Sequence, residues 1–145
     1  MTKCSEVMTS RPVSCMPEDV VARAAKLMKV GNIGSIPVIQ DEKSMKLVGI
    51  VTDRDLAMHI VAEGRDPKST KVGAVMTGDV VTCMADDDLQ MALDAMGSHQ
   101  LRRIPVIDSA AKLVGIIAQA DVATRVNQPT KTAEVVKEIS QAKPK

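Results

Sequence analysis

No Phe, Tyr or Trp occurs among the 145 residues of this chain. A protein without aromatic rings has no platform on which single-stranded bases or sugar rings stack. Its core has to consist of aliphatic side chains and of the ten methionines, which fill irregular gaps well. Any base that the protein binds would therefore lie between aliphatic side chains.

An excess of charge of one sign is also absent, since 19 basic and 18 acidic side chains give a net charge of +1. This balance offers no electrostatic reason to bind nucleic acid or an acidic membrane surface. No apolar run approaches the roughly 18 residues that a membrane span requires, and the N-terminus lacks an apolar signal region. These features favour a cytoplasmic protein that binds neither nucleic acid nor membranes.

Cysteine and histidine are scarce. The three cysteines, Cys4, Cys15 and Cys83, stand far apart, and their odd number argues against a disulfide framework. We expect Cys15 and Cys83 to be small buried core residues, and a redox switch stays open as the alternative. His59 and His99 have no partner at metal-ligand spacing, which predicts no metal site.

Motifs for common enzyme chemistry are missing. The sequence holds no G-x-x-x-x-G-K-[ST] loop, no G-x-G-x-x-G, no H-E-x-x-H and no G-x-S-x-G. We therefore expect a protein that is not an enzyme and that needs no cofactor.

What the sequence does contain is a tandem duplication. Val7-Met8-Thr9 recurs 68 residues later as Val75-Met76-Thr77, and the same offset relates Ile36-Pro37-Val38-Ile39 to Ile104-Pro105-Val106-Ile107. After a length difference of two residues, the run from Lys46 to Ile50 matches the run from Lys112 to Ile116. The predicted organisation is a first repeat at 7–63, a connector at 64–74, a second repeat at 75–126 and a C-terminal tail with a short helix at 127–145.

The same elements are predicted in both repeats. One apolar helix face is formed in the first repeat by Val21, Ala24, Ala25 and Met28 and in the second by Leu89, Ala92, Leu93 and Met96. Acidic residues at 18–19 and 86–88 are expected to begin these helices, and Gly31 and Gly97 to end them. Runs at 36–39 and 47–51 predict paired strands. A second helix is predicted from Leu56, Ala57, Ile60 and Val61, and an amphipathic tail helix from Val135, Val136 and Ile139.

The predicted order of elements in each repeat is therefore approximately β-α-β-β-α. Over nearly the whole chain, the pair of repeats resembles tandem cystathionine-β-synthase-type (CBS) domains, the Bateman module. The segments that carry this resemblance are Gly49-Ile50-Val51-Thr52-Asp53-Arg54-Asp55 and Leu101-Arg102-Arg103-Ile104-Pro105-Val106-Ile107. The resemblance implies an α+β fold in which two α/β-type repeats pack sheet to sheet with pseudo-twofold symmetry. The chain is similar to stand-alone members of the family, because no other domain accompanies the two repeats.

The resemblance further implies a regulatory module that binds an adenosine-containing ligand, such as AMP, ADP, ATP or S-adenosylmethionine, in a cleft between the repeats. By position, Thr52 and Asp55 would hold the ribose, and Arg102 and Arg103 would reach the phosphates. These residue types suit the chemistry, because a carboxylate accepts hydrogen bonds from both hydroxyls of a cis-diol and a guanidinium matches phosphate oxygens.

The two clefts are expected to differ. The second has Asp121, but Ala118 stands in place of the hydroxyl, and Gly34 and Ser35 stand in place of the arginines. Arg54 would compensate there only in part. We therefore expect one competent site and one weak site. At the competent site, adenine would lie among aliphatic side chains, which include Val13, Ile36 and Pro37.

Purely structural roles for the same residues stay open as alternatives to ligand binding. The segment from Thr52 to Asp55 also fits a helix capping box, and Arg102 and Arg103 also fit a solvated strand edge. The chain would then be a ligand-free structural or protein-interaction module, with a redox response through its cysteines as a further option. In every case we expect a homodimer with an unknown protein target, because the family pairs its modules through helices and apolar side chains are available for burial at Met28, Met58, Met91 and Met96.

Overall fold

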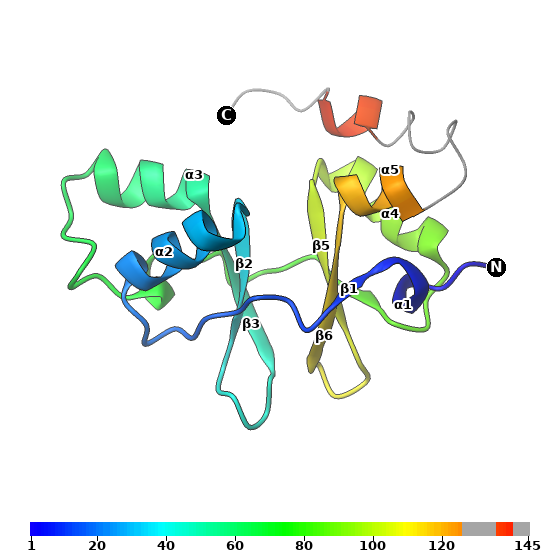
Figure 1. Cartoon of the computed structure of the whole chain (residues 1–145), viewed down its shortest axis with the longest axis horizontal. Coiled ribbons are helices and arrows are strands. Elements are labelled where there is room, and N and C mark those ends of the chain that lie inside the picture. Colours follow the sequence, from blue (N-terminus) through cyan, green and yellow to red (C-terminus); the bar gives the residue numbers. More distant parts are fainter. Residues whose placement is uncertain (126–135, 141–145) are drawn as a thin grey trace. The chain divides into compact units, whose positions relative to one another are not determined.

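The computed structural model of the chain describes residues 1–125 and 136–140 (Figure 1). Two compact units are present, one formed by residues 12–80 and one by residues 1–11 together with the described part of 81–145. Each unit contains both helices and strands, as expected for an α+β protein. Within the described ranges, no helix has the length and apolar character needed to cross a membrane.

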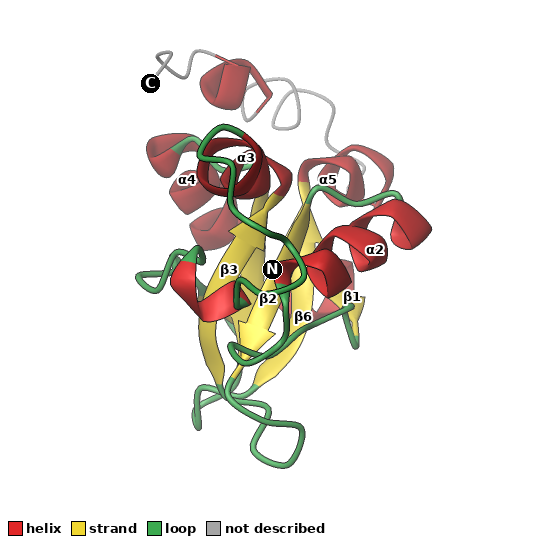
Figure 2. Ribbon diagram, turned by 90° about the vertical axis from the view of Figure 1, so that its left-hand side faces the viewer, coloured by secondary structure: helices red, strands yellow, loops and turns green. Residues whose placement is uncertain are grey.

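Residues 12–80 form a unit around one antiparallel strand pair. In chain order its elements are α2 (Val21–Gly31), β2 (Ser35–Ile39), β3 (Leu47–Thr52), α3 (Asp53–Leu56), the π-helical turn η1 (Ala57–Val61) and the 3-10 turn η2 (Val72–Ala74). Strand β2 pairs with β3, so that Ile36 lies opposite Val51, and α2 packs against β2 (Figure 2). The predicted strand pair at 36–39 and 47–51 is thus confirmed.

The other unit is built on a four-stranded sheet in the order β1-β6-β5-β4. In chain order its named elements are α1 (Cys4–Val7), β1 (Thr9–Ser10), β4 (Cys83–Met84), α4 (Leu89–His99), β5 (Arg103–Ile107), β6 (Leu113–Ala118) and α5 (Gln119–Arg125). The central pair β5 and β6 is antiparallel with Ile104 opposite Ile117, which is the same arrangement as β2 and β3.

Each Val-Met-Thr segment pairs with the strands of the other repeat. Thr9 of β1 lies opposite Ile116 of β6, and Thr77 forms the equivalent antiparallel bridge to Ile50 of β3. The duplicated sequence does not reveal this exchange, because each segment stands at the start of its own repeat. The two compact units therefore cross the repeat boundaries expected from the duplication, and those boundaries stay a prediction.

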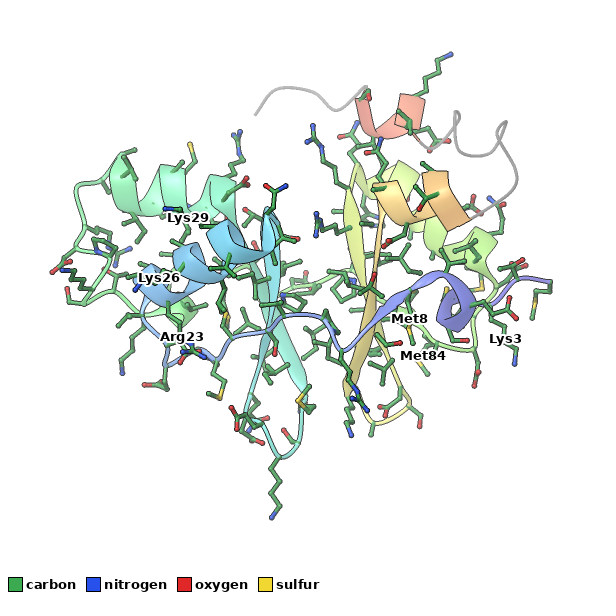
Figure 3. The ribbon with its side chains drawn as sticks, in the orientation of Figure 1. Lys3, Met8, Arg23, Lys26, Lys29 and Met84 are labelled. Atoms are coloured by element: carbon green, nitrogen blue, oxygen red, sulfur yellow. The ribbon has the colours of Figure 1, made fainter. Side chains whose placement is uncertain are left out.

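A glycine in each receiving strand makes the exchange possible. A Cβ atom on Gly49 of β3 would lie 2.9 Å from the backbone oxygen of Thr77 and 2.6 Å from the sulfur of Met76. Gly115 of β6 is approached in the same way by Met8, which is labelled in Figure 3. Any larger residue at these positions would hold the exchanged segment away from the strand.

The cores are aliphatic and sulfur-containing, as the composition requires. Cys15 and Cys83 are 3% and 6% exposed and act as small core residues, as predicted. Met28 and Met96 are also buried, so the prediction that they offer a dimer surface is wrong. Their helix positions face the strands of their own units. Of the four methionines named for that surface, Met58 and Met91 are exposed, at 50% and 59%.

The predicted start and end of α2 are wrong by a few residues. Asp19 accepts a hydrogen bond from the backbone N–H of Met16 (2.8 Å) and stabilises the turn before the helix instead of its first turn. The helix begins after Val20, which caps it without a side-chain bond, and the left-handed residue at its end is Asn32 with φ of 51°. Asparagine tolerates this conformation better than most residues, so Gly31 is not needed there.

Helix α4 begins as predicted but ends later. Asp88 is its N-cap and accepts a hydrogen bond from the backbone N–H of Gln90 (3.1 Å). The helix continues through Gly97 to His99, and Gln100 takes the left-handed conformation with φ of 56°. The prediction that Gly97 ends the helix is therefore wrong, because the left-handed residue that closes the helix is Gln100, whose N–H donates to the oxygens of Gly97 and Met96.

The second helix of the first repeat differs from the predicted α-helix. After Leu56 it continues as a π-helical turn in which the N–H of Ala62 donates to the oxygen of Ala57 (2.9 Å). A π turn holds more residues than an α turn, so the apolar spacing no longer follows one face. Ile60 is buried as predicted, but Ala57 and Val61 are exposed. In α2, Ala25 is exposed as well.

The predicted C-terminal helix is confirmed over the residues that can be described there. Residues 136–140 are helical, and Ile139 is 5% exposed in the same core cluster as Met96. Val135 and the remainder of the predicted tail lie outside the described residues.

Candidate functional site

The candidate ribose-binding residues lie at the junction between β3 and α3. The backbone N–H of Thr52 donates to Oδ2 of Asp55 (2.9 Å), and the backbone N–H of Asp55 donates to Oγ1 of Thr52 (3.1 Å). This is a complete capping box, so the structural interpretation of the motif is confirmed. Both residues are half-buried. The two bonds hold a hydroxyl and a carboxylate side by side in a fixed arrangement.

The side chains of Thr52 and Asp55 keep further hydrogen-bonding positions beyond those used in the capping box. An ionised carboxylate has two oxygens and about four acceptor positions, and the box uses one oxygen of Asp55. The Thr52 hydroxyl accepts one bond in the box and keeps its own O–H as a donor. A capping box and a diol-binding site can therefore coexist at this turn.

The equivalent turn of the second repeat is half of this arrangement. The backbone N–H of Ala118 donates to Oδ2 of Asp121 (2.8 Å), which repeats the first bond of the box. Alanine has no hydroxyl, so the second bond has no counterpart. The difference between the two turns that the sequence predicted is present in their hydrogen bonding.

Ser35 is a residue that the sequence analysis treated only as a neutral replacement for an arginine. It is the first residue of β2 and lies opposite Thr52 in β3. Its side chain is 7% exposed, and its Oγ has no hydrogen-bond partner among the residues that the structure describes. A buried hydroxyl without a partner costs free energy, and this one lies at the strand position opposite Thr52. Periodicity cannot reveal this, since it carries no information on partners.

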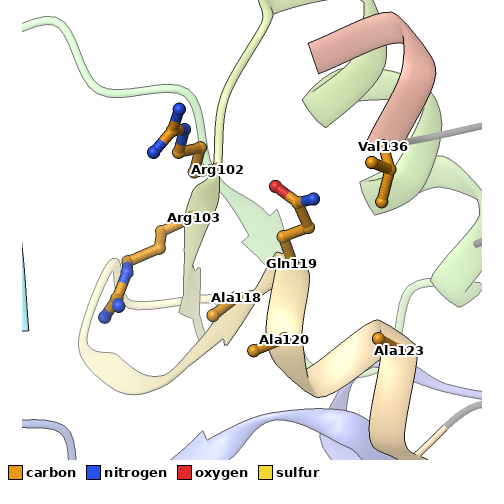
Figure 4. Close-up of a pocket in the computed structure, with 7 residues that line it drawn as sticks. All are labelled: Arg102, Arg103, Ala118, Gln119, Ala120, Ala123 and Val136. Atoms are coloured by element: carbon orange, nitrogen blue, oxygen red, sulfur yellow. The ribbon is translucent and has the colours of Figure 1, made fainter. Parts of the chain in front are cut away.

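Arg102 and Arg103 lie beside a hollow of 320 Å³ on their own unit (Figure 4). Arg103 is the first residue of β5 and pairs with Ala118 of β6, and the oxygen of Arg102 accepts a bond from the N–H of Gln119 (2.8 Å). The hollow is also lined by Ala120, Ala123 and Val136. Arg102 is exposed and Arg103 is half-buried.

Neither guanidinium takes part in an ion pair within residues 1–125 and 136–140. No described carboxylate therefore neutralises the charge of either side chain. These arginines and the Thr52–Asp55 turn belong to different compact units, whose relative positions are not determined. The expectation that the two pairs of residues serve one ligand stays a prediction.

The residues predicted around adenine belong to the unit of residues 12–80. Ile36 and Pro37 are fully buried in β2, and Val13 is 43% exposed. The chain near Val13 runs along β2, because the N–H of Cys15 donates to the oxygen of Pro37 (3.1 Å). Arg54, the predicted helper of the weak site, is exposed in α3. The backbone of residues 13–15 thus lies next to β2, and the adenine contacts stay a prediction.

Comparison with known proteins identifies the family. The model of the CBS domain matches the chain twice, at residues 4–62 and 72–127. The CBS domain-containing protein YhcV of Bacillus subtilis is 38% identical over 128 residues, which cover 88% of this chain and 86% of YhcV. The chain therefore belongs to the CBS-domain family, as a tandem pair.

Solved structures agree with this assignment. Hypoxic response protein 1 of Mycobacterium tuberculosis, solved with two coordinated zinc ions, matches with a TM-score of 0.78 and 30% identity over 86% of this chain and 99% of that one. The CBS domain pair of protein MJ0100, in complex with 5'-methylthioadenosine and S-adenosyl-L-methionine, matches with a TM-score of 0.74 and 26% identity over 85% and 94%. CBS domain pairs are regulatory modules, and some of these structural neighbours bind adenosine ligands.

In the part of this chain that the structure describes, no three His, Cys, Asp or Glu side chains gather in a way that could hold a metal ion.

Proposed function

We propose that this protein is a regulatory sensor that binds an adenosine-containing ligand, namely AMP, ADP, ATP or S-adenosylmethionine. Binding would change its conformation or its affinity for a partner protein. The observation that carries the proposal is the fixed hydroxyl and carboxylate of Thr52 and Asp55 beside the buried hydroxyl of Ser35, which has no hydrogen-bond partner among the described residues. The ligands of the MJ0100 domain pair support the choice of an adenosine compound.

Each group has a physical role in the proposed complex. The Asp55 carboxylate accepts hydrogen bonds from the two ribose hydroxyls, and these bonds are strengthened by its charge. Thr52 and Ser35 supply hydroxyl groups next to it. Arg102 and Arg103 contact the phosphates, since neither forms an ion pair with the described residues and a guanidinium matches two phosphate oxygens at once.

The sensor we propose does not catalyse a reaction and needs no cofactor or metal besides its ligand. We also propose that it acts as a homodimer. The solved CBS-CP12 protein, which is 27% identical over 90% of this chain and 74% of that one, is hexameric, which supports association of modules of this kind.

Isothermal titration calorimetry with AMP, ADP, ATP and S-adenosylmethionine tests the proposal on the full chain. We expect saturable binding of at least one of them at one dominant site per chain, because only the first turn has the hydroxyl and the complete box. Two equal sites would contradict the predicted asymmetry. If none of the four binds, the satisfied capping box is the whole role of the motif, and the chain is a structural or interaction module.

Comparing a ligand that has a phosphate with one that lacks it distinguishes the role of the arginines from that of the ribose site. Replacing Arg102 and Arg103 with alanine is expected to weaken AMP binding by roughly 10- to 150-fold, which corresponds to about 1.5 to 3 kcal/mol for hydrogen bonds to charged groups. Binding of 5'-methylthioadenosine should stay close to that of the parent. Competition titrations measure both values.

Lys29→Ala is the matched control, because it removes an exposed cation from α2 (Figure 3). We expect it to leave both affinities unchanged. An equal loss for AMP and 5'-methylthioadenosine in the arginine variant would place the effect on the adenosine site or on the fold and would refute the phosphate role.

A further inference from the structure

Cys4 and Cys83 come together in the structure although 78 residues separate them in the sequence. Cys4 begins α1, and Cys83 begins β4 in the same unit. Two backbone hydrogen bonds fix the segments next to each other, from the N–H of Cys4 to the oxygen of Asp87 (3.0 Å) and from the N–H of Ser5 to the oxygen of Ala85 (3.0 Å). Their chain neighbours Lys3 and Met84 are labelled in Figure 3.

The two thiols share one buried environment, in which each shifts the pKa of the other and each donates to a backbone oxygen, Cys4 to Asp88 (4.0 Å) and Cys83 to Pro105 (3.9 Å). Both belong to the same core cluster, and they are 0% and 6% exposed. The neighbouring Cys83 thiol lowers the pKa of the Cys4 thiol, against the opposing effects of burial and of the negative charges of Asp87 and Asp88. The neighbouring Cys4 thiol and burial raise the pKa of Cys83. The thiolate therefore forms more readily at Cys4 than at Cys83.

Cys15 provides an internal contrast. It lies in the unit of residues 12–80 and belongs to the core cluster of that unit. Burial raises its pKa to about 12, with a smaller contribution from the negative charge of Asp19. A thiol with such a pKa is almost fully protonated at neutral pH and reacts slowly.

From this geometry we propose that Cys4 and Cys83 form a redox-active dithiol whose substrate is a low-molecular-weight disulfide, RSSR. The Cys4 thiolate attacks one sulfur of RSSR, which forms a mixed disulfide and releases one RSH after protonation. Cys83 then loses its proton and attacks the Cys4 sulfur, which forms the intrachain disulfide and releases the second RSH. Two electrons pass from the protein to the small disulfide, and no other reactant is needed.

Local opening of α1 and β1 gives the reagent a route to the thiols. Helix α1 has four residues and β1 has two, and elements this short open at a lower free energy than the core of the unit, which exposes both thiols. The disulfide would then fasten the exchanged segment of residues 1–11 to its unit and remove loop-closure entropy from the unfolded chain.

Cleavage after glutamate distinguishes the possible disulfides in the full chain. Complete cleavage places Cys4 in peptide 1–6, Cys15 in peptide 7–18 and Cys83 in peptide 64–134. The native protein is incubated with oxidised glutathione, blocked with an alkylating reagent and digested without reductant. We expect the protein to lose two hydrogen atoms in mass, peptide 1–6 to be linked to peptide 64–134, and Cys15 to be alkylated only after denaturation.

Cysteine variants and a denatured sample test whether the native fold selects the disulfide between Cys4 and Cys83. Cys15→Ser should form the same disulfide at the same rate as the parent, whereas Cys4→Ser and Cys83→Ser should form none. The oxidised parent should melt at a temperature several degrees higher than the reduced parent. In denaturant, all three pairings should appear, which shows that the native fold selects one.

Three results would overturn the proposal. These are a link to peptide 7–18 in the native protein, disulfides between chains only, or three free thiols after incubation at a ratio of oxidised to reduced glutathione that oxidises ordinary protein dithiols. Since the mapping is done on the parent protein, a variant that fails to fold does not affect the outcome.

Discussion

Replacing Asp55 with asparagine is expected to weaken the binding of the adenosine ligand by roughly 10- to 150-fold while the melting temperature stays close to that of the parent. The affinity falls because charge-assisted hydrogen bonds to ribose, which contribute about 1.5 to 3 kcal/mol, are lost. The fold is kept because an asparagine oxygen can accept the bond that Thr52 donates to Oδ2 of Asp55. Calorimetric titration and thermal unfolding of the same preparation measure both quantities.

The second repeat offers a matched control for this variant. Asp121 accepts the same backbone bond from Ala118, so Asp121→Asn makes the same chemical change in a turn without a hydroxyl. We expect it to leave the dominant binding site unchanged. A loss of binding in Asp121→Asn with normal binding in Asp55→Asn would reverse the assignment of the two sites.

A third variant separates the capping role from the ligand role. Asp55→Ala removes both the charge and the acceptor, so it should weaken binding and also lower the stability by on the order of 1 kcal/mol, as the loss of a cap does. If Asp55→Asn binds every adenosine ligand as the parent does, Asp55 has only the capping role.

Gly49→Ala is expected to lower the free energy of unfolding by about 1 to 3 kcal/mol, which is the usual cost of inserting a methyl group into a packed site. The new Cβ would lie 2.9 Å from the backbone oxygen of Thr77, and this oxygen accepts the bond from the N–H of Ile50 (2.9 Å). A backbone atom held by a hydrogen bond cannot move away without breaking it. The melting temperature should fall by roughly 2–8 °C for each kcal/mol.

Gly78→Ala is the control, since Gly78 follows Thr77 directly and a Cβ there would meet only the oxygen of Val48 at 3.9 Å. It should change stability little. Gly115→Ala should behave like Gly49→Ala, because Met8 and Thr9 approach Gly115 as Met76 and Thr77 approach Gly49. Equal stability of Gly49→Ala and Gly78→Ala would show that the contact with the exchanged segment does not contribute to the fold.

Local pattern predicted the strands and the start of α4 well. The strand pair at 36–39 and 47–51 follows from β-branched runs on either side of a polar turn, and strand pairing of this kind depends on near neighbours. The Thr52–Asp55 capping box also forms within four residues, so the sequence contains all its partners. The bounds of α2 and the π turn at Ala57–Val61 were predicted wrongly because packing against the rest of the unit sets them.

The sequence by itself determined that the protein is a duplicated, aliphatic α+β chain with a hydroxyl and a carboxylate at one turn and only the carboxylate at the other. Only the tertiary structure decided which strand receives each Val-Met-Thr segment, that the buried Ser35 hydroxyl has no partner within residues 1–125 and 136–140, and that Cys4 and Cys83 share one core cluster. The physical reason is the range of the interactions. Periodicity and caps are set by residues a few positions apart, whereas burial and the exchange of segments depend on contacts between residues that are distant in the chain.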